Sequence, residues 1–350
     1  MKKNPFTLSF GKEPAQFISR LAQTNEMVEN FTDESPVNQI CMLTGVRGSG
    51  KTVMLTSLSK EFKKHDDWVV VELNPMKDML LSLAAKLYSI KELGSIFIKA
   101  KLNLTVFGIG VSIDNSLPIS DIETALEKML DELRKHNKKL LILVDEIVNN
   151  EYVRIFSSTF QIFLRQNYSI FLIMTGLYGN IYDLQNESSL TFLYRAPKVM
   201  LEPLNINAIA KMYNQTLGIS FEKSMKMAGL TKGYPFAFQV LGYLCWNSEN
   251  KDDLNEILPK FDQYLEEYVY EKIWSELSET DRRVVGELSQ KGEVKIKEIR
   301  DELNMNSGEM SVYKSRLLRK GIISSTKYGY ISLSLPRFAE IVQNWMMGEE

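Results

Sequence analysis

Hydrophobic residues in the first 200 positions fall into two kinds of stretch. Short continuous apolar runs predict strands that are covered on both faces. These runs occupy 39–44, 68–73, 140–144, 169–174 and 198–203. The stretches between them repeat apolar residues every three or four positions and predict helices, over 50–64, 77–91, 120–136 and 151–166. Alternating strands and helices predict an α/β fold, a parallel sheet with helices on both faces.

Residues 95–114 follow a different pattern. Ile96, Ile98 and Ala100 alternate with their neighbours, and glycines 108 and 110 then interrupt the pattern. This alternation predicts a β hairpin or ribbon inserted into the sheet domain. The insertion is either a sheet edge or a contact surface for a partner or a second subunit.

The strands stop after Pro203, and the pattern predicts two further domains. Residues 204–277 carry helical spacing throughout and predict a small helical domain. From 278 to 350 the order is helix, short strand, two helices and two short strands, which is winged-helix spacing. The sequence therefore predicts a sheet domain over 1–203, which contains the 95–114 insertion, followed by a helical lid and a winged helix.

Composition limits the class of protein. Hydrophobic residues make up 44% and charged residues 25%, which excludes a disordered chain, a collagen and a disulfide miniprotein. The net charge of −2 excludes general coating of nucleic acid but allows a local basic patch. Cys41 and Cys245 lie in apolar runs and are expected to be buried free thiols. Two histidines and two cysteines make a zinc site improbable.

The N-terminal residues carry two lysines but no apolar stretch behind them, so they do not form a signal peptide. No run approaches the ~20 apolar residues that a membrane span requires. We therefore expect a cytoplasmic protein without membrane contact.

The segment from Gly45 to Thr52 matches the pattern G-x-x-x-x-G-K-[ST] in full, after a predicted strand and before a predicted helix. In this arrangement glycines let the backbone wrap a phosphate, and loop N–H groups and the helix N-terminus attract it. Lys51 would reach the β- and γ-phosphates, and Thr52 would offer its hydroxyl to Mg²⁺. The predicted nucleotide-binding residues of this loop are Gly45, Val46, Arg47, Gly48, Ser49, Gly50, Lys51, Thr52 and Val53.

An acidic pair, Asp145 and Glu146, follows the buried strand 140–144. Beside a phosphate loop, Asp145 would hold Mg²⁺ through water, and Glu146 would orient and deprotonate the attacking water. Alternatively, the pair only caps the next helix.

These landmarks resemble those of AAA+ ATPases, over about residues 10–240. Thr175 follows strand 169–174, where such proteins keep a polar residue near the γ-phosphate. Arg195 precedes the last strand, at the place of the arginine finger that acts across a subunit contact, so the resemblance implies self-association. The segment from Phe17 to Arg20 resembles the box on the adenine side. Alternatively, Thr175 only ends a strand, and Arg195 is a surface arginine. Arg165 is a weaker candidate than Arg195 for a positive charge near the phosphate.

Within AAA+ proteins, the phosphate loop is similar to that of prokaryotic origin-recognition-like and STAND ATPases. Lys232-Gly233-Tyr234-Pro235-Phe236-Ala237 is similar to the Gly-x-Pro motif of STAND proteins, in which the proline packs near the nucleotide. Pro235 could equally begin a helix. Residues 236–248 contain no arginine, so the sensor-2 arginine of AAA+ proteins is not evident. This departure favours a slow switch over a continuously cycling ring motor.

The third helix of the predicted winged helix, 309–320, carries basic residues and could enter a DNA major groove. The candidate DNA contacts are Lys314, Arg316, Arg319 and, on the hairpin tip, Lys327. Acidic and basic residues nearly balance in this domain, whereas a strong DNA binder usually has a clear basic footprint. A protein contact or a structural role is therefore the alternative.

The sequence thus predicts an ATPase that binds ATP or ADP with Mg²⁺ and switches with nucleotide state, coupled to double-stranded DNA through the winged helix. The alternative is a signalling or assembly scaffold with slow turnover and a protein partner. ATP is preferred to GTP by the resemblance, since the sequence has no Asn-Lys-x-Asp motif. A small-molecule kinase is a third, weaker hypothesis, because no acceptor pocket is evident.

Overall fold

The computed structural model describes residues 3–9, 14–114, 116–249 and 253–348. Its contacts divide the chain into two compact units. We call Leu21–Thr44 with Lys51–Met200 the sheet unit. We call the remainder the helical unit; it holds the N-terminal segment up to Arg20, the short loop Gly45–Gly50 and the chain from Leu201 onward. The division between the units therefore passes through the predicted phosphate loop.

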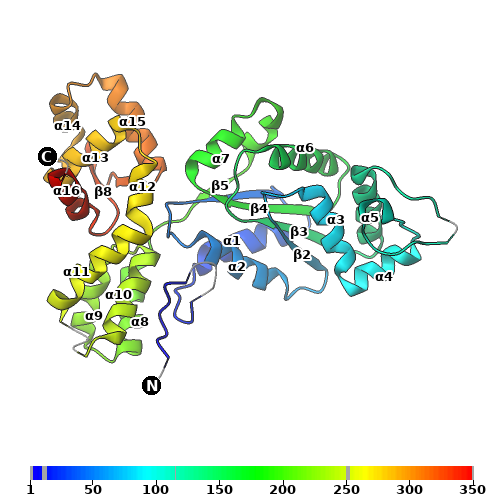
Figure 1. The fold of residues 1–350 in the computed structure, drawn as a ribbon, viewed down its shortest axis with the longest axis horizontal. Helices are drawn as coiled ribbons and strands as arrows, with labels where there is room; N and C mark the ends of the chain where they lie inside the picture. The colour runs from blue at the N-terminus through cyan, green and yellow to red at the C-terminus, as the bar shows by residue number, and fades with distance from the viewer. Residues whose placement is uncertain (1–2, 10–13, 115, 250–252, 349–350) are drawn as a thin grey trace. The chain divides into compact units, whose positions relative to one another are not determined.

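Five parallel strands form the centre of the sheet unit, in the order β2-β3-β4-β1-β5 (Figure 1). Their bounds are Ile40–Thr44 (β1), Trp68–Leu73 (β2), Lys139–Val144 (β3), Ile170–Gly176 (β4) and Lys198–Met200 (β5). The parallel sheet predicted from the apolar runs is confirmed. Strand β4 lies between β1 and β3, so the ends of these three strands are neighbours at one edge of the sheet.

Helices cover both faces of this sheet (Figure 1). The helices of this unit are α1 (Leu21–Thr32), α2 (Lys51–Phe62), α3 (Met79–Ser89), α4 (Lys91–Lys99), α5 (Ile122–Lys135), α6 (Glu151–Arg165) and α7 (Tyr178–Gln185). Successive side chains of a strand point to opposite faces. Thus Leu172 belongs to the core formed with α3, α5 and α6. The next residue back, Phe171, packs against Phe31 of α1 and Trp68, with ring centroids 5.1 and 4.8 Å away.

The predicted hairpin over 95–114 is wrong. Helix α4 continues to Lys99, and a 3-10 turn, η1, spans Thr105–Phe107. The helical period comes from Leu93 and Phe97, four residues apart and both buried. Ile98, one residue beyond the buried Phe97, is 43% exposed. Helix α4 begins at Lys91, before the alternation starts. A short alternation of apolar residues inside this helix therefore resembled the pattern of a strand.

The helical unit contains six helical segments between Leu201 and Leu277. They are α8 (Ile206–Leu217), α9 (Phe221–Leu230), α10 (Pro235–Asn247), α11 (Leu254–Leu265), a π-helical turn η3 (Glu266–Tyr270) and α12 (Glu271–Ser275). The π-helical turn η3 thus separates α11 from α12. Phe6 of the N-terminal segment is 2% exposed in this core and packs against Tyr213 and Phe238.

The chain beyond Leu277 builds a small antiparallel sheet, β6-β8-β7, with four helices. Their bounds are α13 (Glu279–Lys291), β6 (Val294–Lys295), α14 (Ile296–Glu302), α15 (Ser307–Arg319), β7 (Ile323–Ser324), β8 (Tyr330–Leu333) and α16 (Phe338–Gly348). The sequence predicted all of these elements except α16. Met310 and Leu317 of α15 are buried.

This C-terminal region is bonded to the helices before it. The Tyr270 hydroxyl donates to the Pro336 carbonyl at 2.7 Å. The Arg337 guanidinium donates to both oxygens of Asp262 at 2.8 and 2.7 Å. The two regions share one hydrophobic cluster. The division into a lid over 204–277 and a winged helix over 278–350 stays a prediction.

Both cysteines are buried and unpaired, as predicted. Burial raises the pKa of Cys41 to about 12 and that of Cys245 to about 12. None of the helices in the described residues combines the length and the apolar character needed to span a membrane.

The raised thiol pKa values make a testable prediction. At pH 8 a thiol with a pKa of about 12 is ionised to about one part in 10⁴, whereas an ordinary thiol is about a quarter ionised. The native protein should therefore react with a thiol reagent about a thousand times more slowly than the denatured chain, for both cysteines. Rapid labelling of either cysteine in the folded protein would contradict the burial described here.

Candidate nucleotide-binding site

The phosphate loop connects the end of β1 at Thr44 to the first residue of α2, Lys51. Gly48 and Gly50 have φ values of +74° and +88°. Residues with a side chain rarely adopt this left-handed backbone conformation, whereas glycine adopts it without a steric penalty. The Ser49 N–H donates to the Val46 carbonyl at 3.2 Å and closes a turn. The sequence pattern of glycines thus corresponds to a sharply curved backbone ahead of a helix N-terminus.

Three consecutive residues of the helical unit contact this loop. The Tyr234 hydroxyl donates to the Arg47 carbonyl, and the Phe236 N–H donates to the Gly48 carbonyl at 3.2 Å. Burial raises the pKa of Tyr234, which keeps its hydroxyl protonated as a donor. Between them, Pro235 at the start of α10 has its Cγ 3.8 Å from the position that a Cβ on Gly50 would take. The predicted site residue Pro235 therefore packs on the loop and also begins a helix.

Arg20 also holds the loop, a role that was not predicted. Its guanidinium donates to the Ser49 carbonyl at 3.1 Å and to the Glu202 carbonyl. Burial lowers the pKa of this guanidinium, against the charge of Glu202. The sequence assigned the segment 17–20 to the adenine side through Phe17, which is half-buried. The arginine at the end of that segment was the signal that could have revealed the contact.

A second group of site residues lies at the carboxyl edge of the sheet. The Thr52 hydroxyl donates to one carboxylate oxygen of Asp145 at 2.7 Å, and the Thr175 hydroxyl donates to the other. The backbone N–H of Glu146 lies 3.2 Å from the Thr175 hydroxyl oxygen. The strand order explains this group, because β4 ends between the strand that carries Asp145 and the strand that leads into α2. Four predicted site residues are thus brought together.

Glu146 has a φ of +51°, a left-handed conformation that is uncommon for a residue with a side chain. The turn lets Ile147 bury completely and donate its N–H to the Thr175 carbonyl at 2.7 Å. The side chain of Glu146 is exposed at the same edge. Such local backbone strain is frequent at functional sites. An exposed carboxylate beside a bonded aspartate suits a group that must reach a substrate water.

The residues fit a nucleotide with Mg²⁺. Thr44 is the last residue of β1, and Ser49 lies in the loop. The hydroxyl oxygens of both are buried without a hydrogen-bond partner. Among the described residues, no group of three or more His, Cys, Asp or Glu side chains could hold a metal. Mg²⁺ characteristically binds through one or two protein oxygens, with substrate phosphates and water completing its shell. Thr52 and Asp145 supply such a pair of oxygens.

The remaining predicted contacts lie elsewhere. Arg195 is exposed at the end of a 3-10 segment, η2 (Ser188–Arg195). Arg319 is exposed and Lys314 half-buried on α15. Lys327 is exposed on the hairpin and pairs with Glu293 at 3.2 Å.

Arg316 is bonded within the protein. Its guanidinium donates to Asp281 at 2.6 and 3.0 Å and to the Ser278 hydroxyl at 3.0 Å. Asp281 is 1% exposed and forms a capping box with Ser278 at the start of α13. A buried carboxylate without its cation is costly. The bonds to Asp281 and Ser278 give Arg316 a part in packing α15 on α13, and its contact with DNA stays a prediction.

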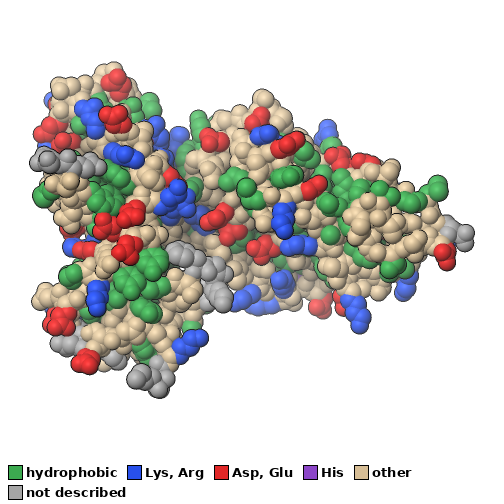
Figure 2. All heavy atoms as spheres, in the orientation of Figure 1, with side chains coloured by type: hydrophobic (Ala, Val, Ile, Leu, Met, Phe, Trp, Pro, Cys, Tyr) green, Lys and Arg blue, Asp and Glu red, His purple; other side chains and the backbone are tan. Residues whose placement is uncertain are grey.

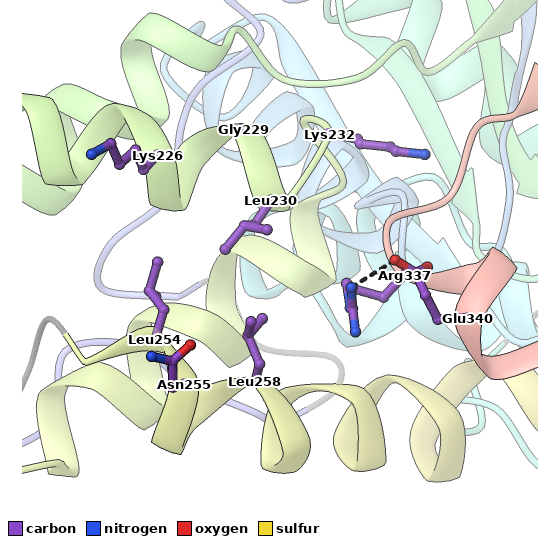
Figure 3. Close-up of a pocket in the computed structure, with 9 residues that line it drawn as sticks. All are labelled: Lys226, Gly229, Leu230, Lys232, Leu254, Asn255, Leu258, Arg337 and Glu340. Atoms are coloured by element: carbon purple, nitrogen blue, oxygen red, sulfur yellow. Dashed lines mark hydrogen bonds and ion pairs between the residues drawn. The ribbon is translucent and has the colours of Figure 1, made fainter. Parts of the chain in front are cut away.

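A groove of about 560 Å³ lies in the helical unit between α9, α11 and the start of α16 (Figure 3). Leu230, Leu254 and Leu258 form its apolar wall, and the Arg337–Glu340 ion pair lies at one side. None of the predicted site residues lines it.

Comparisons with known proteins agree with this arrangement. Residues 18–175 match the model of the KAP family P-loop domain. The chain has the P-loop NTPase fold. Residues 267–342 match a domain of unknown function, DUF8462. No curated protein matches the sequence.

Solved structures extend the likeness to nearly the whole chain. A Walker-type ATPase of Pyrococcus abyssi has a TM-score of 0.64 at 14% identity, covering 93% of this chain and 96% of its own. The ORC2 protein of Aeropyrum pernix, in ADPNP–ADP complexes, has a TM-score of 0.58 at 11% identity, covering 97% of each chain. The predicted resemblance to origin-recognition-like ATPases is confirmed at the level of the fold.

The close contact between the loop and Tyr234 makes a prediction for Gly48→Ala. A Cβ on Gly48 would lie 2.2 Å from the Tyr234 hydroxyl, and alanine at a φ of +74° costs about 1–2 kcal/mol. We expect the affinity for an ATP analogue, measured by titration, to fall by about tenfold or more. Gly229→Ala is the matched control, because a Cβ there meets nothing within 4 Å. Equal affinities for both variants would show that the loop does not need its observed shape.

Proposed function

We propose that this P-loop NTPase binds and hydrolyses ATP and acts as a nucleotide-dependent switch. The observation that carries the proposal is the bonded group of Thr52, Asp145 and Thr175, with Glu146 beside it. A purely structural acidic turn would not need a hydroxyl from the residue after the loop lysine. In support, the glycine conformations of the loop suit a bound phosphate.

Each residue has a separate task in this proposal. The loop N–H groups and Lys51 would bind the phosphates, and Thr52 and Asp145 would hold Mg²⁺, which would neutralise phosphate charge. Glu146 orients the attacking water and accepts its proton as general base. Thr175 donates its hydroxyl proton to Asp145 and so holds this carboxylate in place beside the γ-phosphate. Pro235 and the segment around Phe17 enclose the nucleotide.

Self-association would complete the site. The resemblance to AAA+ proteins gives Arg195 the role of an arginine finger, and its exposure at the end of η2 suits contact with a second subunit. The absence of arginine from residues 236–248 supports slow or activated turnover. Hydrolysis would then time a change of state rather than drive continuous motion.

The C-terminal region is proposed to act as a winged helix that contacts double-stranded DNA. On the face shown in Figure 2, acidic and basic side chains are interspersed, so binding would depend on a few residues. The candidates are Lys314, Arg316, Arg319 and Lys327, together with Tyr328, which is fully exposed at the hairpin tip. The alternative is a STAND-like assembly scaffold with a protein partner, which the slow-switch argument favours equally.

The catalytic assignment predicts how turnover changes with concentration and mutation. Glu146→Gln should bind ATP but lose about 10²–10⁴-fold in turnover, because the water loses its base. Glu151→Gln, five residues along on α6, is the matched control and should be unchanged. Turnover per subunit of the wild type should rise with protein concentration. Equal turnover in Glu146→Gln and the wild type would remove Glu146 from the mechanism.

Arg195→Ala should keep ATP binding and lose turnover, and in GTPases such fingers contribute about 10³–10⁵ in rate. Arg165→Ala, at the end of α6, serves as control. A loss of tenfold or less would make Arg195 a structural or surface arginine.

DNA contact predicts a charge effect. Lys314→Glu and Lys327→Glu should each weaken duplex binding. Each should also reduce the slope of log affinity against log salt concentration by about one. Lys135→Glu, on α5 of the sheet unit, should not. Filter binding across salt, with and without ATP, measures this. If the wild type binds no duplex at low salt in either condition, the scaffold alternative stands.

A further inference from the structure

One ion pair joins the phosphate loop to the C-terminal region. The Arg47 guanidinium donates to both carboxylate oxygens of Glu276, at 2.5 and 3.4 Å. The two side chains are 33% and 35% exposed. Arg47 occupies one of the variable positions of the loop pattern, where phosphate binding does not itself require an arginine. The ion pair therefore calls for a reason of its own.

Glu276 stands at the end of α12, where the helices give way to the C-terminal region. Its carbonyl accepts from the Lys320 ammonium at 3.3 Å, and its carboxylate lies 3.7 Å from Lys272. Lys320 follows α15, and its ammonium is also 4.0 Å from the buried Asp281 that binds Arg316. Polar contacts are thus continuous from Arg47 to the end of α15.

The backbone of Arg47 is held by a turn that also reaches the C-terminal region. Tyr234 donates to the Arg47 carbonyl. Two residues earlier, the Lys232 ammonium donates to the carbonyls of Leu333 and Leu335 at 3.2 and 3.4 Å. The loop residue that carries the ion pair is therefore fixed at both its main chain and its side chain by elements that also contact the C-terminal region.

We propose that the Arg47–Glu276 ion pair is a latch that bound nucleotide phosphates open. The latch rests on the proposed function, since it needs a nucleotide on the loop. Guanidinium groups bind phosphate in the same forked manner as carboxylate, and a polyphosphate carries more charge than one carboxylate. Phosphates on the loop compete for Arg47, the Glu276 carboxylate is released, and the main-chain carbonyl of Glu276 that binds Lys320 is free to shift. ATP state is thereby reported to the helix that carries the candidate DNA contacts.

The latch predicts the direction and the size of the change in nucleotide affinity when the Arg47–Glu276 ion pair is broken. If nucleotide opens the pair, opening the pair beforehand must tighten nucleotide binding by the same factor. An ion pair this exposed contributes little, up to about 1 kcal/mol. That figure corresponds to a gain in affinity of about two- to fivefold.

The test compares Glu276→Gln with Glu302→Gln. The first removes the carboxylate charge from the latch, and the second removes the partner of Lys291 elsewhere in the C-terminal region. Each full-length protein is titrated with a fluorescent, non-hydrolysable ATP analogue and Mg²⁺. We expect Glu276→Gln to bind two- to fivefold more tightly than the wild type and Glu302→Gln to bind equally. Unchanged or weaker binding by Glu276→Gln overturns the latch.

Hydrogen exchange of the amides of α15 gives an independent measurement. In the wild type, the analogue should speed exchange around residues 316–320. Glu276→Gln and Arg47→Gln should show the faster exchange without nucleotide, and nucleotide should add nothing further. If the wild type binds the analogue but its exchange there stays the same, the latch fails and the proposed function stands. If the wild type does not bind the analogue, the proposed function fails, and the latch with it.

Discussion

The phosphate loop is held by hydrogen bonds from residues outside it, and much of the structure follows from this constraint. The six residues between β1 and α2 lie outside both elements, so their main-chain groups need partners from elsewhere. Carbonyls of Arg47, Gly48 and Ser49 receive donors from Tyr234, Phe236 and Arg20. These donors satisfy the carbonyls on one side of the loop. A loop built this way carries any change in its shape to the residues that hold it.

The chemical half of the site depends on strand order instead. Asp145, Thr175 and Thr52 are far apart in sequence and meet because β3, β4 and β1 are consecutive in the sheet. Parallel strands bring their carboxyl ends to one edge, where ligands of open α/β sheets bind. The sheet must be buried on both faces to keep this edge in register. Its continuous apolar strands and the helices α2, α3 and α6 meet that requirement.

The sequence reveals the parts whose chemistry is local. The strand runs, the glycine loop and the acidic pair each depend on neighbouring residues, and the structure has the sheet and helices that the runs predicted. It could not reveal the ion pairs of Arg316 and Glu276, because the partners of these residues are 35 and 229 positions away. The error over 95–114 has another origin: the helical period there lies in Leu93 and Phe97, and the alternation of isoleucines masked it.

The basic residues of α15 serve two tasks that compete. Arg316 neutralises the buried Asp281, and Lys320 binds the carbonyl of Glu276, so neither is available to DNA without a cost inside the protein. A helix whose basic side chains are bonded inside the protein binds a polyanion poorly, unless one of these bonds is weak enough to break. The bond to Asp281 is not weak, because opening it leaves a charge buried. The ion pairs of Glu276 with Arg47 and Lys272 are partly exposed to solvent, so breaking them costs little free energy. Any signal that passes from the loop to α15 therefore has its easiest route through Glu276, and its size is limited by the modest strength of that contact.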